Sequence, residues 1–170
     1  MYQTKTFALN RKNFLTVTQF ISLVGVAVIV PLFHQQAITG PVVNATLFIS
    51  VTLLGVQNAI LVGLIPSLVA LSTGLLPPVL APMIPFIMVG NTILIIVFGY
   101  LKEKNFWLGI VTASVLKFLF LFSTSSIVIN LLLKKEIATK VATMMSWPQL
   151  LTALVGGIIA FMFLKSIKKF

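Results

Sequence analysis

The 170-residue chain is 59% hydrophobic and only 8% charged, with twelve lysines and arginines against two acidic residues and a formal net charge of +10. Because a soluble domain carries about 25% charged residues, this composition excludes an ordinary soluble protein and indicates an integral membrane protein. The positive charge does not point to nucleic acid, because lysines that flank membrane spans set topology and contact anionic lipid. No cysteine is present, which excludes disulfides and thiolate metal sites.

The apolar runs predict six transmembrane helices in one membrane domain, residues 1–170, since a span needs about 20 mostly apolar residues. The first follows the basic start KTFALNRK and is too long for a signal-peptide core. Residues 31–41 (PLFHQQAITGP) are expected to form a polar outer loop. The next apolar stretch is too long for one span, and GVQN at 55–58 predicts a hairpin within it. The expected spans are about 14–33, 42–55, 58–74, 84–101, 106–132 and 146–165.

The distribution of basic residues predicts the orientation of these helices. With the N-terminus in the cytoplasm, eight of the lysines and arginines lie inside and three lie outside. Short cytoplasmic loops are enriched in Lys and Arg, so we expect an N-in, C-in topology. Both proline-rich segments, 31–41 and LLPPVLAPMIP at 75–85, then lie at the outer face. They either stiffen the rim of an outward-facing mouth or simply end helices.

Lys117 lies in the middle of the apolar run ASVLKFLFLF. A lysine at the centre of a span costs about 2.5–3.5 kcal/mol, so something must offset its burial. Counting about 1.5 Å per residue places Lys117, Asn91 and Ser22 at similar depths in three spans. These side chains are therefore expected to meet near the midplane. Two interpretations stay open: hydrogen bonds to carbonyls freed by a broken helix, or a polar or anionic ligand in a cavity.

Further polar and aromatic side chains are expected around the same cavity. Ser114 shares one helix face with Lys117, and Asn44, His34 and Gln36 are expected nearer the outer surface. Trp147 is either an interfacial residue or a stacking surface for a flat ligand. The predicted substrate-binding residues are Asn91, Lys117, Trp147, Gln149, Asn44, His34, Gln36 and Ser114.

Small residues recur along two of the predicted spans. Gly55, Ala59, Gly63 and Ser67 stand at every fourth position, and alanines and glycines gather within 153–160. Such faces let helices approach closely, either within the chain or against a partner subunit.

The chain offers little for catalysis. Glu103 and Glu136 each lie beside lysines in polar breaks, so carboxylate metal sites and proton relays lack their groups. The single histidine, His34, cannot form a zinc site alone. No G-x-x-x-x-G-K-[ST] phosphate loop occurs, so any ATP hydrolysis belongs to another chain. We expect no catalytic residue, no metal and no cofactor.

Six helices in about 170 residues, with GPVVNA, PFIMVGN, LKFLF and SWPQLLTALVGG, resemble the membrane-embedded substrate-binding (S) components of energy-coupling factor transporters, a type of ABC transporter. The resemblance implies a plasma-membrane protein of a prokaryote that captures a vitamin or vitamin precursor from outside. It also implies partners: one transmembrane coupling subunit and two ATPase subunits. In that family two outer loops cover the ligand, and here these correspond to PLFHQQAITG and LLPPVLAP. The family often docks through Ala-x-x-x-Ala in its first helix, a motif replaced here by Ser22, Gly25 and Ala27.

The expected function is therefore high-affinity capture of a small organic micronutrient for an ATP-driven module. Three rivals stay open. A stand-alone secondary carrier or channel would transport by itself, and usually shows an inverted repeat. An intramembrane hydrolase would depend on His34, and a structural subunit of a membrane complex would bind no small molecule.

Overall fold

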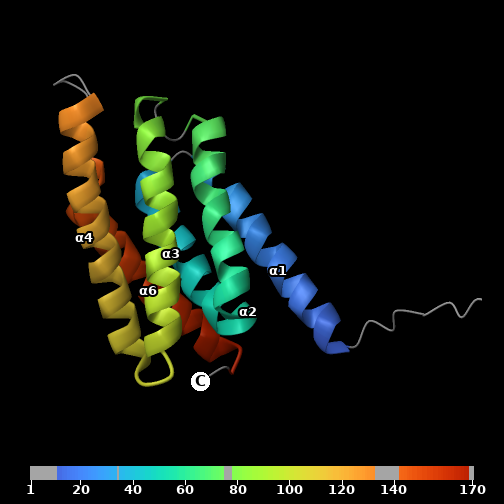
Figure 1. Cartoon of the computed structure of the whole chain (residues 1–170). Coiled ribbons are helices and arrows are strands. Elements are labelled where there is room, and N and C mark those ends of the chain that lie inside the picture. The colour runs from blue at the N-terminus through green and yellow to red at the C-terminus, as the bar shows by residue number, and fades with distance from the viewer. Residues whose placement is uncertain (1–10, 34, 75–77, 133–141, 169–170) are drawn as a thin grey trace, which may run out of the picture.

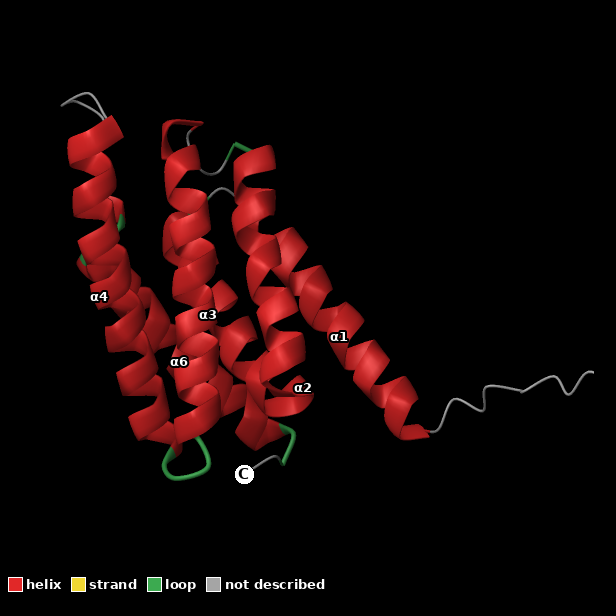
Figure 2. Cartoon of the chain, viewed as in Figure 1, coloured by secondary structure: helices red, strands yellow, loops and turns green. Residues whose placement is uncertain are grey.

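The structure of the protein is a computed structural model that describes residues 11–33, 35–74, 78–132 and 142–168, and all regular elements in these ranges are helical. The α-helices are α1 (Arg11–Ile29), α2 (Gln36–Ser72), α3 (Ile84–Leu101), α4 (Phe106–Leu132) and α6 (Trp147–Ser166), with short 3-10 helices η1 (Val30–Phe33) and η2 (Pro78–Met83). Figure 2 shows these helices, with a short loop joining α3 and α4. Within the described ranges, five helical segments are long and apolar enough to cross a membrane, so the prediction of an all-helical fold is confirmed there and the apolar helices are compatible with membrane spans.

Helix α2 folds back on itself at Gly55, within the predicted hairpin. Gly55 has φ 81° and ψ 169°, a non-helical conformation inside the helix. In a straight helix Leu47 and Gly63 would lie about 24 Å apart. Instead, a methyl group added to Gly63 would be 3.4 Å from Leu47 Cδ2. The two arms of α2 therefore run antiparallel, and the bend faces the lower end of the molecule in Figure 1.

Replacing Gly55 with alanine should lower the free energy of unfolding by about 1–3 kcal/mol, because this φ/ψ region is nearly restricted to glycine. No heavy atom lies within 4 Å of the added Cβ, so the effect would come from backbone strain alone. Thermal unfolding of the detergent-purified chain measures the change. The control is Gln57→Ala, because Gln57 is helical and exposed beside the bend. A Gly55→Ala variant as stable as this control would contradict the strained bend.

The arms of α2 form the centre of the bundle. Helices α1, α3 and α6 all pack against α2, and α4 packs against α3 and α6. Figure 1 shows α1 leaning away from the other helices toward its N-terminal end. The start of α1, the turn between α3 and α4, and the C-terminal end lie at the same end of the molecule (Figure 1).

Two apolar clusters fill the bundle. One joins α2, α3, α4 and α6 in the half near the α3–α4 turn, and it includes Phe48, Leu94 and Phe98. The other lies toward the opposite end and includes Met83, Leu121 and Met145. The buried polar residues Asn91 and Lys117 fall between these clusters along α3 and α4, so an apolar layer covers them on the side of the α3–α4 turn.

Expected and observed helix bounds agree for α3 and α4 and differ by one residue for α6. The prediction that 31–41 forms a loop is wrong, because α2 begins at Gln36 and contains Pro41. The backbone N–H groups of Ile38 and Thr39 bond the Gln35 carbonyl, and Thr39 Oγ1 donates to the Val30 carbonyl at 3.3 Å. These bonds start the helix early. Pro41 then removes only one helical hydrogen bond.

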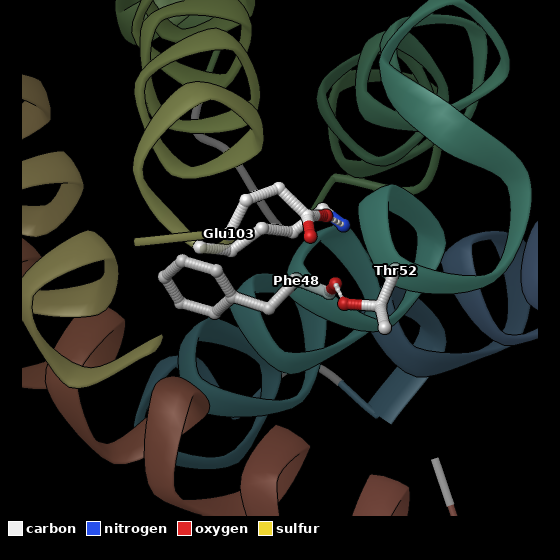
Figure 3. Close-up of polar contacts among 4 residues, drawn as sticks. Phe48, Thr52 and Glu103 are labelled. Atoms are coloured by element: carbon white, nitrogen blue, oxygen red, sulfur yellow. Dashed lines mark hydrogen bonds and ion pairs between the residues drawn. The ribbon is translucent and has the colours of Figure 1, made fainter. Parts of the chain in front are cut away.

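The end of the bundle that carries the α3–α4 turn is polar. Glu103 is paired with Lys102 in this turn and is 77% exposed. A hydrogen bond from Lys102, with the charge of that ammonium, holds the pKa of the Glu103 carboxyl below its usual range. Figure 3 draws Glu103 together with Phe48 and Thr52 of α2, where Thr52 Oγ1 donates to the Phe48 carbonyl at 3.0 Å. Glu103 thus lies outside the apolar runs, as predicted; Glu136 lies outside the described residues.

Candidate functional site

A buried lysine is the centre of the candidate site. Lys117 is 3% exposed, and its amine donates to Asn44 Oδ1 at 2.6 Å and to Asn91 Oδ1 at 2.8 Å. Of the described residues, only Glu103 is acidic, and it is at the polar turn with Lys102. The amine is therefore held by two neutral amides, with no described carboxylate as counter-charge. We name Asn44, Asn91 and Lys117 the polar triad.

Both amides of the polar triad are fixed by bonds to the backbone. Asn91 Nδ2 donates to the Gly63 carbonyl at 2.9 Å, across from α3 to the second arm of α2. Asn44 Nδ2 donates to the Gly40 carbonyl at 2.9 Å and lies 3.5 Å from Thr152 Oγ1 on α6. With their nitrogens engaged, both amide oxygens point at the lysine. The triad thus ties the two arms of α2 to α3, α4 and α6.

Glycine on α6 allows this arrangement at the α2–α6 crossing. A methyl group added to Gly156 would be 2.7 Å from Asn44 Cβ and 2.7 Å from the Pro41 carbonyl oxygen. No side chain fits in that space, so α6 contacts the backbone of α2 where Asn44 projects. The small residues expected in 153–160 therefore include one that positions the polar triad from within the chain.

The polar triad borders a cavity of about 80 Å³. Its other lining residues come from η1, both arms of α2, α3, the start of α6 and the residues just before it. The polar lining residues are Thr39, Asn44, Ser67, Asn91, Lys117 and Gln149, and the rest are Pro31, Gly40, Val43, Pro66, Ala70, Ile87 and Met145. The polar triad lies at the deep end of this cavity, since Thr39, Ala70 and Met145 come from the ends of elements remote from the α3–α4 turn.

Several hydrogen-bond donors in this lining are unused. An ammonium has three N–H groups, and Lys117 spends two of them on the asparagines. Ser67 is 4% exposed, lines the cavity and makes no hydrogen bond to any described residue. Gln149 Nε2 donates one hydrogen to the Met144 carbonyl at 3.2 Å and has a second. The cavity therefore presents the lysine amine and free hydrogen-bond donors.

The predicted site residues divide into three groups. Asn44, Asn91, Lys117 and Gln149 come together at the cavity. Trp147 is 63% exposed and Ser114 is fully buried with an unpartnered Oγ, and neither is among the described residues that line the cavity. His34 lies outside the described residues, and Gln36 is described only as the first residue of α2.

The expected meeting of Ser22 with Asn91 and Lys117 is wrong. Ser22 is exposed on α1, the helix that leans away from the bundle. Asn44 takes its place, from the first arm of α2. Because α2 begins at Gln36, Asn44 lies about 12 Å into the helix and reaches the depth of Lys117.

Sequence reasoning missed Thr39 and Thr152 and assigned Ser67 only to a helix-packing face. Pro66, next to Ser67, was the available signal, because irregular backbone at membrane depth is tolerated where it is buried in protein or lines a water-filled cavity. The first interpretation of Lys117, bonds to carbonyls freed by a broken helix, does not match its contacts, which are amide oxygens.

Protein families, characterised proteins and solved structures compared with the chain give no match. In the described part of the chain, no group of three or more His, Cys, Asp or Glu residues could hold a metal ion. What the arrangement can do is bind: a fixed amine and free donors face a small cavity.

Proposed function

We propose that this protein is a membrane-embedded substrate-capture subunit that binds a small organic micronutrient, a vitamin or vitamin precursor, from outside and delivers it to an ATP-driven energy-coupling module. The observation that carries the proposal is the buried amine of Lys117 at the deep end of a cavity, held by two asparagines with one donor left over. A buried ionisable group within a membrane is expensive and generally marks a functional site.

The proposal assigns six membrane crossings with both termini in the cytoplasm. The two arms of α2 supply two crossings, because the shorter, residues 56–72, reaches about 26 Å against about 30 Å of hydrocarbon. Lys102 and Lys104 at the α3–α4 turn and Lys165 near the end of α6 support a cytoplasmic assignment for that end. The cavity then lies toward the outer face, where a nutrient would arrive.

The size of the cavity sets a condition on this function. Pockets for drug-sized ligands measure roughly 300–1,000 Å³, well above the 80 Å³ here. A vitamin would therefore enter only if the cavity widens. The lining residues Pro31, Thr39 and Met145 stand in η1, in the first turns of α2 and just before α6. These element ends can separate while the helical core stays packed.

The proposed partners are a transmembrane coupling subunit and two ATPase subunits, as in the transporter family that the sequence resembles. A chain without a phosphate loop needs another subunit to hydrolyse ATP. A purely structural subunit is the competing function that the site itself favours, because the polar triad satisfies its amides internally and could act only to join helices. Ligand binding separates these functions.

A thermal-shift screen of the purified chain against vitamins and their precursors tests the proposal. A ligand at about 100 times its Kd adds about 2.7 kcal/mol of stability, which raises the melting temperature clearly. We expect at least one strong hit, weakened more than tenfold by Lys117→Ala. Lys104→Met is the matched control, because Lys104 is exposed at the polar turn and lies 5.2 Å from the Tyr100 ring centroid. A broad panel without any hit would favour the structural subunit, and transport by the isolated chain would favour a carrier or channel.

A further inference from the structure

We infer that the deep end of the cavity accepts a carboxylate, so that the cargo is a monocarboxylic acid anchored by its acid group between Lys117 and Ser67. This inference rests on the proposed function, because it names the class of substrate for the same site.

The charges around the Lys117 amine favour an acidic ligand. Asn44 and Asn91 bind the Lys117 amine through neutral oxygens, and in the described part of the chain the one acid is at the polar turn. An amine that is 3% exposed has little contact with water, and an uncompensated buried charge is strongly unfavourable. A ligand carrying one negative charge would stabilise the protonated amine and complete the site. A neutral ligand supplies no such partner.

The free hydrogen-bond donors at the cavity match the acceptors of a carboxylate. Beyond its two bonds to asparagine, the ammonium has one N–H left. The Ser67 hydroxyl is a second donor, 4% exposed and without a partner among described residues. The spare amide N–H of Gln149 is a third. A carboxylate has two oxygens and about four lone-pair sites, so it can accept all three bonds.

Size and total charge distinguish a carboxylate from a phosphate as the ligand of this cavity. A carboxylate is smaller than a phosphate, so it makes the smaller demand on a cavity of about 80 Å³. A phosphate ester carries nearly two negative charges and is usually held by clusters of arginine. A single lysine matches a single carboxylate. The remainder of the cargo would extend past Gln149 and Met145 toward the outer end of the cavity.

Pairs of compounds that differ only in the acid group test the inference. Suitable pairs are nicotinate and nicotinamide, biotin and biotinamide, pantothenate and panthenol, and lipoate and lipoamide, added to the full screen of vitamins of every charge. Isothermal titration of the purified chain then gives Kd for each binder. We expect an acid to bind and its neutral partner to bind at least tenfold more weakly.

Two serine variants make the test specific. Ser67→Ala should weaken binding of the acid about three- to tenfold and leave the affinity for its neutral partner unchanged. Ser50→Ala is the matched control, because Ser50 is fully buried on the same helix but donates within it to the Thr46 carbonyl at 2.7 Å. Lys117→Met should abolish the preference for the acid. If that variant does not fold, the compound pairs and Ser67→Ala still decide.

The outcomes separate the two proposals. A neutral or cationic compound that binds tightly, with an affinity unchanged by Ser67→Ala, would overturn the carboxylate assignment and leave the capture function standing. A screen in which no compound of any charge binds would overturn the capture function, and the assignment with it.

Discussion

Replacing Lys117 with methionine should lower the free energy of unfolding of the ligand-free protein by about 2–6 kcal/mol. The variant leaves Asn44 Oδ1 and Asn91 Oδ1 buried without a donor, and each unsatisfied buried acceptor costs about 1–3 kcal/mol. A half-turn flip of either side-chain amide would not restore the lost bonding, because the flip would break the hydrogen bond from Asn44 to the Gly40 carbonyl or from Asn91 to the Gly63 carbonyl. Thermal or denaturant unfolding in detergent measures the loss.

A triple variant shows whether this loss comes from the polar triad. In Lys117→Met with Asn44→Leu and Asn91→Leu, no polar atom of the triad remains, and stability should return close to that of the original chain or exceed it. Replacing a whole buried polar group by apolar residues of similar volume is often neutral or stabilising, whereas removing one partner is not. If the single variant Lys117→Met were as stable as Lys104→Met, the hydrogen bonds from Lys117 to the two asparagines would not contribute to the stability of the fold.

The same comparison bears on function. If the triple variant is stable but binds no ligand, the polar triad serves binding, because folding does not need it. A chain that keeps a costly buried lysine although an apolar core would fold as well must use the lysine for something else. The triple variant thus separates a binding site from a device that only joins helices.

The depth of Lys117 and Asn91 could be predicted because residue counting fixes the position of a side chain along a helix axis. Their helices, α3 and α4, have sharp polar ends at the Lys102–Asn105 turn, so their bounds followed directly from the sequence. Counting does not fix which way a side chain points or how a helix tilts. The predicted contact of Ser22 with Asn91 and Lys117 was wrong for this reason: the depth of Ser22 was similar, but α1 leans away from the bundle.

The role of Asn44 was harder to predict because it depends on where α2 begins. Proline at position 41 suggested a loop, yet bonds among residues 30–39 started the helix before it. The hairpin in α2 was predictable from GVQN, since a span cannot be so long without a turn, and Gly55 supplies the necessary φ of 81°. Ser67 was seen only as a small residue, because pattern alone cannot tell a packing face from a cavity wall.

Adding one methyl group at Gly156 should be the most damaging small change at the site, lowering the free energy of unfolding by about 3 kcal/mol or more. Overpacking usually costs about 1–3 kcal/mol, and here two of the nearest atoms are backbone: the Pro41 carbonyl oxygen at 2.7 Å and the Ala45 nitrogen at 2.8 Å. Backbone atoms cannot turn aside as a flexible side chain can. Helices α2 and α6 would have to separate, and thermal unfolding of Gly156→Ala measures the result.

Two other glycines provide graded controls for this prediction. A methyl group on Gly63 comes closest to two side-chain ends, Ile95 Cδ1 at 2.8 Å and Leu47 Cδ2 at 3.4 Å, and lies at ordinary contact distance, 3.7 Å, from Asn91 Cβ, so Gly63→Ala should have a smaller effect. Nothing lies within 4 Å of a methyl group on Gly25, and Gly25→Ala should be neutral or stabilising by up to about 1 kcal/mol. Because Asn44 projects from the crossing that Gly156 permits, Gly156→Ala should also weaken ligand binding. Equal stability of the Gly156 and Gly25 variants would mean that the α2–α6 crossing does not hold Asn44 in place.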